Sequence, residues 1–269
     1  MIPDLTAITS DAVITAAQCW TAWKLADVKE DTMLGKLIGP SMEYVGERIP
    51  IVIDTSIKEI PKTAMNILRI LGHAVRISGS KCDEHRIVNP RVLRQIFDEG
   101  AFCEDELTSV YFGGVLASSR NEDFKDDRAL NFLSLLSSMS SYQIKLHYMI
   151  YTVLRKAYVG KDINFESDWK SKMQLFITLN ELLTYVDQSP IGNCKHDLIM
   201  PHLFWGLDRF DLISNFTYGN ELEVLRHCHD GQGAVFQPSI FGIEFYMWAN
   251  GLSDVSPSHF IDENIQLLI

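Results

Sequence analysis

Two side chains in the stretch 61–77 are the first candidates for chemistry. Arg69 and His73 are separated as residues i and i+4, so a helix would place them on one face. An imidazole transfers protons near neutral pH, and a guanidinium binds phosphate. The pair could therefore act on a phosphodiester, provided that further groups converge on it.

Small helical toxins use an arginine and a histidine as a ribonuclease pair, and the spacing from Arg69 to His73 is one residue short of theirs. No acid close in the sequence completes a general acid–base set. A polar face on the helix that Pro61 opens is the simpler interpretation, and the ribonuclease interpretation stays open as an alternative.

The densest group of potential metal ligands lies in the second half of the chain, at Cys194, His196, His202 and 227–229. A zinc site needs four ligands, usually in pairs separated by two to five residues. Here Cys194 and His196 are one residue apart, and of the consecutive residues His227, Cys228 and His229 at most two can point inward. We therefore assign no metal site, and expect loop and surface histidines.

An acidic segment at 121–127 contains Glu122, Asp123, Asp126 and Asp127. Its spacing lacks the glycine at position six and the glutamate at position twelve of an EF-hand loop, which argues against calcium. These acids precede a helix predicted to begin near Asp127, where negative charge complements the helix dipole. The segment is a candidate surface for a partner.

Other catalytic and cofactor motifs are missing from the sequence. It has no Gly-x-Ser-x-Gly elbow, no Walker A run and no Gly-x-Gly-x-x-Gly. His147 lies in a strongly apolar helix and is expected to be a hydrogen-bonded core residue. The sequence thus assigns no catalytic, cofactor-binding or metal-ligating residue.

Composition narrows the class of protein. The chain has 269 residues, 46% hydrophobic and 22% charged, with a net charge of −11 that counts against broad contact with a phosphate backbone. Five scattered cysteines without CxxC spacing suit a reducing compartment. We find no secretion signal and no apolar run long enough for a bilayer. These features predict a soluble cytoplasmic protein that does not enter membranes.

The elements that would position these residues are mostly helices. Periodic apolar residues predict helices at 11–27, 61–77, 90–101, 106–115, 128–139 and 140–158, and one long helix at 166–186. Asn89 before Pro90 is predicted to cap the start of the helix at 90–101. Ser140 and Gln143 are predicted to form a capping box at the start of the helix at 140–158. The helix at 140–158 should be the buried central one.

The C-terminal part has a different pattern. A helix to about Arg209, a polar segment, a strand at 234–238 and a helix from Ser239 follow the order of a winged-helix module. The fold class is therefore predicted as mainly α, a multi-helix bundle with a winged-helix-like end. The turn at 160–164 suggests a core at 1–160 and a second part at 161–269, packed as one unit.

Several stretches resemble the Abi-alpha (abortive-infection alpha) family of bacterial proteins. They are Pro90-Arg-Val-Leu-Arg-Gln-Ile-Phe-Asp-Glu, Glu104-Asp-Glu-Leu, Phe112-Gly-Gly-Val-Leu-Ala117, Asp126–Asp127 and the run from Phe132 to Gln143. The segments 39–46, 206–213 and 239–245 fit its early and late parts. Phe112 and Gly113 depart from the family's Trp-Ala form. The resemblance spans about 30–250 and implies an association with phage defence, without a reaction or site residues.

Three functions follow as hypotheses. The first is a non-enzymatic sensor or effector regulator of an antiphage abortive-infection system. Its partner would be a co-encoded effector or a phage protein, and its candidate surfaces are 121–127 and 194–233; homo-oligomerisation stays open. The second is a toxic nuclease that uses Arg69 and His73. The third is a winged-helix transcriptional regulator, against which the scarcity of cations near Lys195 and Arg209 argues.

Overall fold

The computed structural model describes residues 31–48, 62–123, 125–167, 169–186, 196–219, 224, 226–227 and 233–267. This part of the chain is mainly α-helical, as predicted, and also contains a small antiparallel sheet. The helix expected at 11–27 lies outside the described residues. Within them, no helix has the length and apolar character needed to cross a bilayer.

The chain forms two compact units, one of residues 1–137 with 249–252 and one of residues 138–248 with 253–268. This division differs from the predicted boundary at 160. The helix at 140–158 belongs to the second unit, whereas the sequence placed it in the first.

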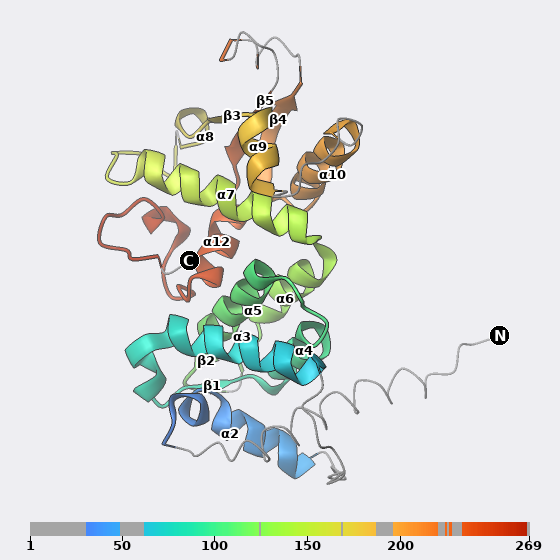
Figure 1. Ribbon diagram of the computed structural model, residues 1–269. Coiled ribbons are helices and arrows are strands. Elements are labelled where there is room, and N and C mark those ends of the chain that lie inside the picture. The colour runs from blue at the N-terminus through green and yellow to red at the C-terminus, as the bar shows by residue number, and fades with distance from the viewer. Residues whose placement is uncertain are drawn as a thin grey trace, which may run out of the picture. The chain divides into compact units, whose positions relative to one another are not determined.

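The first unit consists of helices and one short two-stranded antiparallel ribbon (Figure 1). Asn89 begins α4 as predicted, because its side chain accepts a hydrogen bond from the Arg91 backbone N–H at 2.9 Å. Strand β1 pairs antiparallel with β2. The elements are α2 (Met33–Arg48), α3 (Lys62–Ser78), η1 (Gly79–Asp83), β1 (Ile87–Val88), α4 (Pro90–Gly100), α5 (Glu106–Ser118), β2 (Arg120–Asn121) and α6 (Ala129–Ser138).

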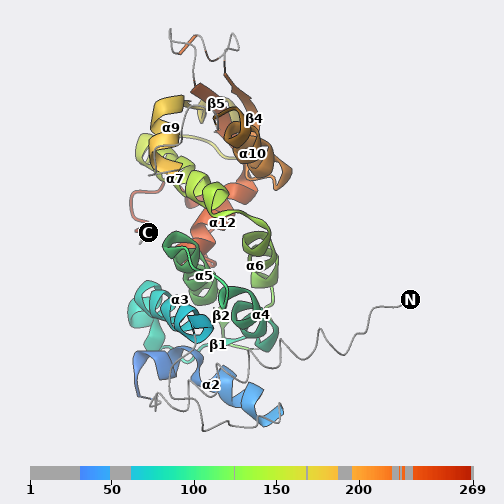
Figure 2. The ribbon, with the colours of Figure 1, turned by 45° about the vertical axis from the view of Figure 1, so that its right-hand side comes forward.

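Helices α3 and α5 make the most extensive helix contact of this unit and lie side by side in both views (Figure 1; Figure 2). Gly113 of α5 permits the close approach, since a Cβ there would stand 2.6 Å from the Cβ of His73 and 2.9 Å from the Ala74 nitrogen. A Cβ on Gly114 would overlap the Ala249 carbonyl. The two glycines therefore allow α5 to pack closely against α3 on one side and against Ala249 on the other.

The second unit is built on α7 (Ser141–Tyr158), which begins with the predicted capping box of Ser140 and Gln143. Two backbone N–H groups at this helix start are therefore satisfied by side chains. Around α7 lie α8 (Trp169–Lys172), β3 (Leu175–Thr178), α9 (Leu179–Val186), α10 (His196–Arg209), β4 (Ile213–Tyr218), β5 (Gly233–Pro238), α12 (Ile240–Ala249) and η2 (Pro257–His259).

The prediction of one helix over 166–186 is wrong. Residues 175–178 form strand β3, which pairs antiparallel with β5 through Leu175 and Phe236. Strand β4 pairs antiparallel with the other side of β5, so the sheet order is β3-β5-β4. Leu175, Leu179, Leu182 and Val186 have helical spacing, but the run Leu-Phe-Ile-Thr is β-prone, and pairing with β5 decides its structure.

Candidate functional site

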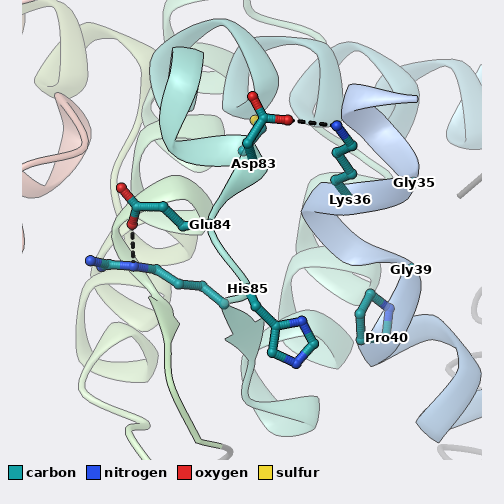
Figure 3. A pocket seen from close by; sticks show the side chains of 9 residues that line it. Gly35, Lys36, Gly39, Pro40, Asp83, Glu84 and His85 are labelled. Carbon is teal, nitrogen blue, oxygen red and sulfur yellow. Dashed lines mark hydrogen bonds and ion pairs between the residues drawn. The ribbon is translucent and has the colours of Figure 1, made fainter. Parts of the chain in front are cut away.

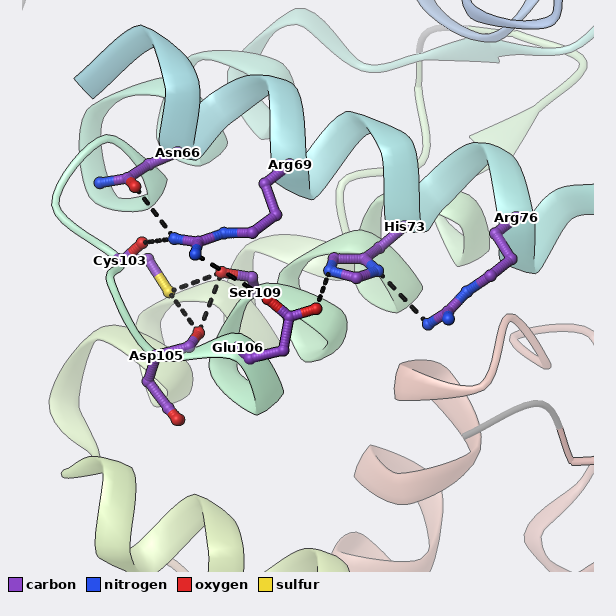
Figure 4. Close-up of polar contacts among 8 residues, drawn as sticks. All are labelled: Asn66, Arg69, His73, Arg76, Cys103, Asp105, Glu106 and Ser109. Carbon is purple, nitrogen blue, oxygen red and sulfur yellow. Dashed lines mark hydrogen bonds and ion pairs between the residues drawn. The ribbon is translucent and has the colours of Figure 1, made fainter. Parts of the chain in front are cut away.

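The structure brings Arg69 and His73 together with an acid that the sequence did not reveal. Both side chains leave α3 toward Glu106, the first residue of α5, whose carboxylate lies between them (Figure 4). The Glu106 Oε1 is 3.0 Å from the His73 Nε2, and the Oε2 is 3.8 Å from the Arg69 Nη1. The partner comes from a residue more than thirty positions away, so local sequence gives no signal for it.

Arg69 is held in place by the loop between α4 and α5. Its Nη2 donates to the Cys103 carbonyl oxygen at 2.8 Å and to the Asn66 Oδ1 at 2.9 Å. Asn66 in turn donates to the Ala101 carbonyl oxygen at 2.8 Å. One edge of the guanidinium therefore stabilises the packing of this loop on α3, which limits its freedom to follow a substrate.

His73 is nearly enclosed, with 12% of its side chain exposed. Burial lowers its pKa, the Glu106 carboxylate raises it and Arg76 lowers it further. The Arg76 Nη2 lies 3.3 Å from the His73 Nδ1, and arginine can only donate. The neutral ring therefore carries its proton on Nε2, the nitrogen that faces Glu106.

The thiol beside this cluster is not activated for covalent chemistry. Cys103 is the nearest thiol, and its Sγ contacts the Ser109 Oγ at 3.4 Å. Burial raises the pKa of Cys103, so the thiolate is disfavoured. The cluster thus offers cations and one imidazole, which suit binding of an anion or proton transfer.

A pocket of about 300 Å³ lies between α2 and the residues around η1 (Figure 3). Its charged side chains pair with one another: the Lys36 Nζ is 2.5 Å from the Asp83 Oδ1, and the Arg86 Nε is 2.7 Å from the Glu84 Oε2. His85 points toward Pro40 across the opening. Because its charges are matched internally, the pocket has no surplus charge to select a ligand.

The carboxylates at 121–127 are largely neutralised by neighbouring cations. Asp126 pairs with Arg128 at 2.7 Å, which together with the Arg128 backbone N–H lowers the pKa of Asp126. Asp127 pairs with Arg91 of α4 at 2.7 Å, and Asp123 with Lys125 at 3.3 Å. This surface therefore presents alternating charge rather than a purely acidic patch.

The predicted histidine–cysteine group is only partly described. Cys194, Cys228 and His229 lie outside the described residues, as does the His196 side chain. The His202 Nε2 lies 2.8 Å from the Ser140 Oγ at the start of α7, and the His227 ring stacks on Phe176 at 5.4 Å. The structure thus engages His202 and His227 in separate contacts, and the described residues contain no group of three metal-ligating side chains.

His147 is fully buried, as predicted for a core histidine. Its Nε2 lies 3.1 Å from the Gly242 carbonyl oxygen, and its ring packs against Tyr151 and Phe245. Burial lowers the pKa of His147 to about 3. The ring is therefore a neutral structural donor near neutral pH.

The sequence did not reveal an aromatic surface on α10 and β4. Trp205 of α10 is 60% exposed and meets Phe216 of β4 edge-on at 5.0 Å. Phe216 stacks with Tyr218 at 6.2 Å, and both stack on the buried Phe204. A bulge in β4 between Ser214 and Thr217 accompanies this arrangement. We call Trp205, Phe216 and Tyr218 the aromatic row.

Comparison with known proteins gives no relative: no family model matches this chain, and neither a curated protein nor a solved structure matches it. The resemblance to the Abi-alpha family therefore stays a prediction from its motifs.

Proposed function

We propose that this chain is a non-enzymatic interaction protein whose second unit is a winged-helix module that contacts protein. The order α7, β3, α9, α10, β4, β5 with β5 in the middle of the sheet supports this topology. Helix α7 packs on both α9 and α10, the pair that corresponds to a helix-turn-helix. In such modules the second helix of the pair contacts the partner, and here that helix is α10.

The surface of α10 favours protein over DNA. A DNA-reading helix needs cations for phosphates and base edges, but α10 contains one arginine, Arg209, against Asp197 and Asp208. It instead presents Trp205, the exposed end of the aromatic row. Exposed tryptophan and tyrosine are the side chains that most often dominate protein–protein binding. The partner we expect is a protein with an apolar depression and a basic rim, complementary to a chain of net charge −11.

The biological setting we propose is bacterial antiphage defence of the abortive-infection type, based on the motif resemblance. The test is phage challenge of bacteria that carry the gene alone or with its native neighbours, at low and high phage dose. Protection at low dose with culture collapse at high dose, dependent on the neighbours, is the expected result. Absence of protection in both formats would contradict the defence role.

A nuclease that uses Arg69 and His73 is the second candidate, and the contact between Glu106 and His73 favours it. The carboxylate could orient the imidazole as a base. Against it, Arg69 is engaged by the Cys103 carbonyl. Expression of the chain alone separates the two candidates: toxicity that is lost in a folded His73→Ala variant supports the nuclease, and a harmless wild-type chain supports the interaction protein.

A further inference from the structure

Helix α3 presents a row of cationic or protonatable side chains on a chain that is acidic overall. Arg69, His73 and Arg76 recur at i, i+4 and i+7, which places them along one face of the helix (Figure 4). Arg76 is exposed, and its Nη2 lies 3.3 Å from the His73 Nδ1. The row therefore has one anchored cation, one enclosed imidazole and one cation at the surface.

Two N–H donors of this row are buried without an aligned acceptor. They are the Nε of Arg69 and the Nε2 of His73. The His73 Nε2 must carry the proton of the neutral ring, and its contact with Glu106 has the distance of an ion pair without the direction of a hydrogen bond. A buried N–H without a hydrogen-bond acceptor destabilises the folded state, so such atoms indicate an absent acceptor.

Glu106 is the anion closest to these donors, but it is loosely held. Its side chain is 68% exposed, and its Oε2 is 3.8 Å from Arg69, too far for a hydrogen bond. A change of side-chain rotamer would carry this carboxylate into solvent without moving α5. The place that it leaves is flanked by Arg69 and His73, whereas Arg76 contacts the other ring nitrogen of His73.

We propose that this face of α3 is a binding site for a phosphate group, and that the Glu106 carboxylate occupies the site when no ligand is bound. A phosphate has more acceptor oxygens than a carboxylate, so it can accept from Arg69 and His73 at the same time. A rotamer change of the exposed Arg76 side chain would bring a third donor to it. Burial lowers the pKa of His73, and an adjacent phosphate would oppose that effect and favour the charged ring. The site is independent of the aromatic row in the second unit.

The experiment is a titration of the full-length chain with inorganic phosphate and, in a second arm, with 5′-AMP. Binding is followed by calorimetry and by the ring nitrogen signals of His73 in NMR spectra. The ionic strength is held constant with chloride. We expect saturable binding, and Glu106→Gln should tighten it by about fivefold, because an exposed ion pair is worth up to about 1 kcal/mol. Tighter binding of 5′-AMP would identify a nucleotide as the source of the phosphate, and equal binding would identify free phosphate.

A second variant and a matched control complete the design. Arg76→Ala lies at the surface and should fold normally while binding at least fivefold more weakly. Asp127→Asn is the control, because it frees Arg91 from a similar exposed ion pair that has no histidine beside it. The same response in Asp127→Asn and Glu106→Gln, or His73 signals that do not move on saturation, would overturn the proposal. RNA cleavage is not a readout, so the result does not depend on either candidate function.

Discussion

Acid should destabilise the second unit through His147. The buried ring is neutral in the folded state, and burial lowers its pKa to about 3, whereas an unfolded histidine titrates near 6.5. Because the folded pKa is the lower one, the unfolded chain binds the proton first as the pH falls. The stability contributed by the neutral ring is therefore present above about pH 6.5 and is lost progressively down to about pH 3.

The size of the effect follows from the two pKa values. Each unit of difference corresponds to about 1.4 kcal/mol once the pH lies between the two values. Lowering the pH from 7 to 5 should therefore reduce the free energy of unfolding by about 2 kcal/mol from this residue alone. That is a large share of the ~5–15 kcal/mol that stabilises a typical domain.

The assay is urea unfolding at pH 7, 6 and 5, compared between wild type and His147→Gln. Glutamine can donate to the Gly242 carbonyl but does not titrate. Trp169, Trp205 and Trp248 report on this unit by fluorescence when Trp20 and Trp23 are changed to phenylalanine. The variant will be less stable at pH 7, yet its free energy of unfolding should fall less between pH 7 and 5. An equal pH dependence in both proteins would refute the account of His147 as a neutral buried donor.

Three further predictions concern stability and use urea unfolding as the measurement. Gly114→Ala should lower the free energy of unfolding by about 2–3 kcal/mol, because the new Cβ meets the Ala249 carbonyl. Gly72→Ala, in open space, should leave it unchanged or raise it by up to about 1 kcal/mol, and equal effects of the two variants would contradict the packing at Gly114. Arg120→Met should cost about 3 kcal/mol, since the guanidinium donates to three carbonyls around η1; a neutral effect would show that those carbonyls find other donors. Ser140→Ala should lower the free energy of unfolding by about 1 kcal/mol, because it removes the N-cap of α7, and Ser141→Ala should leave it almost unchanged. An equal effect of both variants would show that the cap does not contribute.

Local signals predicted the ends of several helices correctly. Asn89 and the box of Ser140 and Gln143 are confirmed as caps, because a cap is made by residues within one turn of each other. The same kind of signal was missed at the start of α9. The Thr178 backbone N–H donates to the Glu181 carboxylate at 3.0 Å, and the Glu181 N–H donates to the Thr178 Oγ1 at 3.2 Å. That box would have ended the long predicted helix before Leu179.

Contacts between distant segments could not be predicted in this way. Strand β3 depends on β5, nearly sixty residues later, and a two-fold pattern of only four residues gives little indication of it. The contact of Glu106 with His73 depends on the close packing of α5 on α3, which Gly113 permits. The aromatic row likewise depends on the bulge in β4 and the placement of α10 beside it. In each case tertiary packing, rather than local propensity, positions the residues.

Cross-linking from position 205 tests the proposed protein contact most directly. A photoreactive phenylalanine analogue replaces Trp205 in one variant and Phe102, which is 74% exposed in the first unit, in a matched control. Both are expressed with the native neighbouring genes, with and without phage infection, and the adducts are identified by mass. We predict a specific adduct with one protein from position 205 and none from position 102. Adducts with nucleic acid from position 205, or the same protein captured from both positions, would contradict the proposed interaction surface.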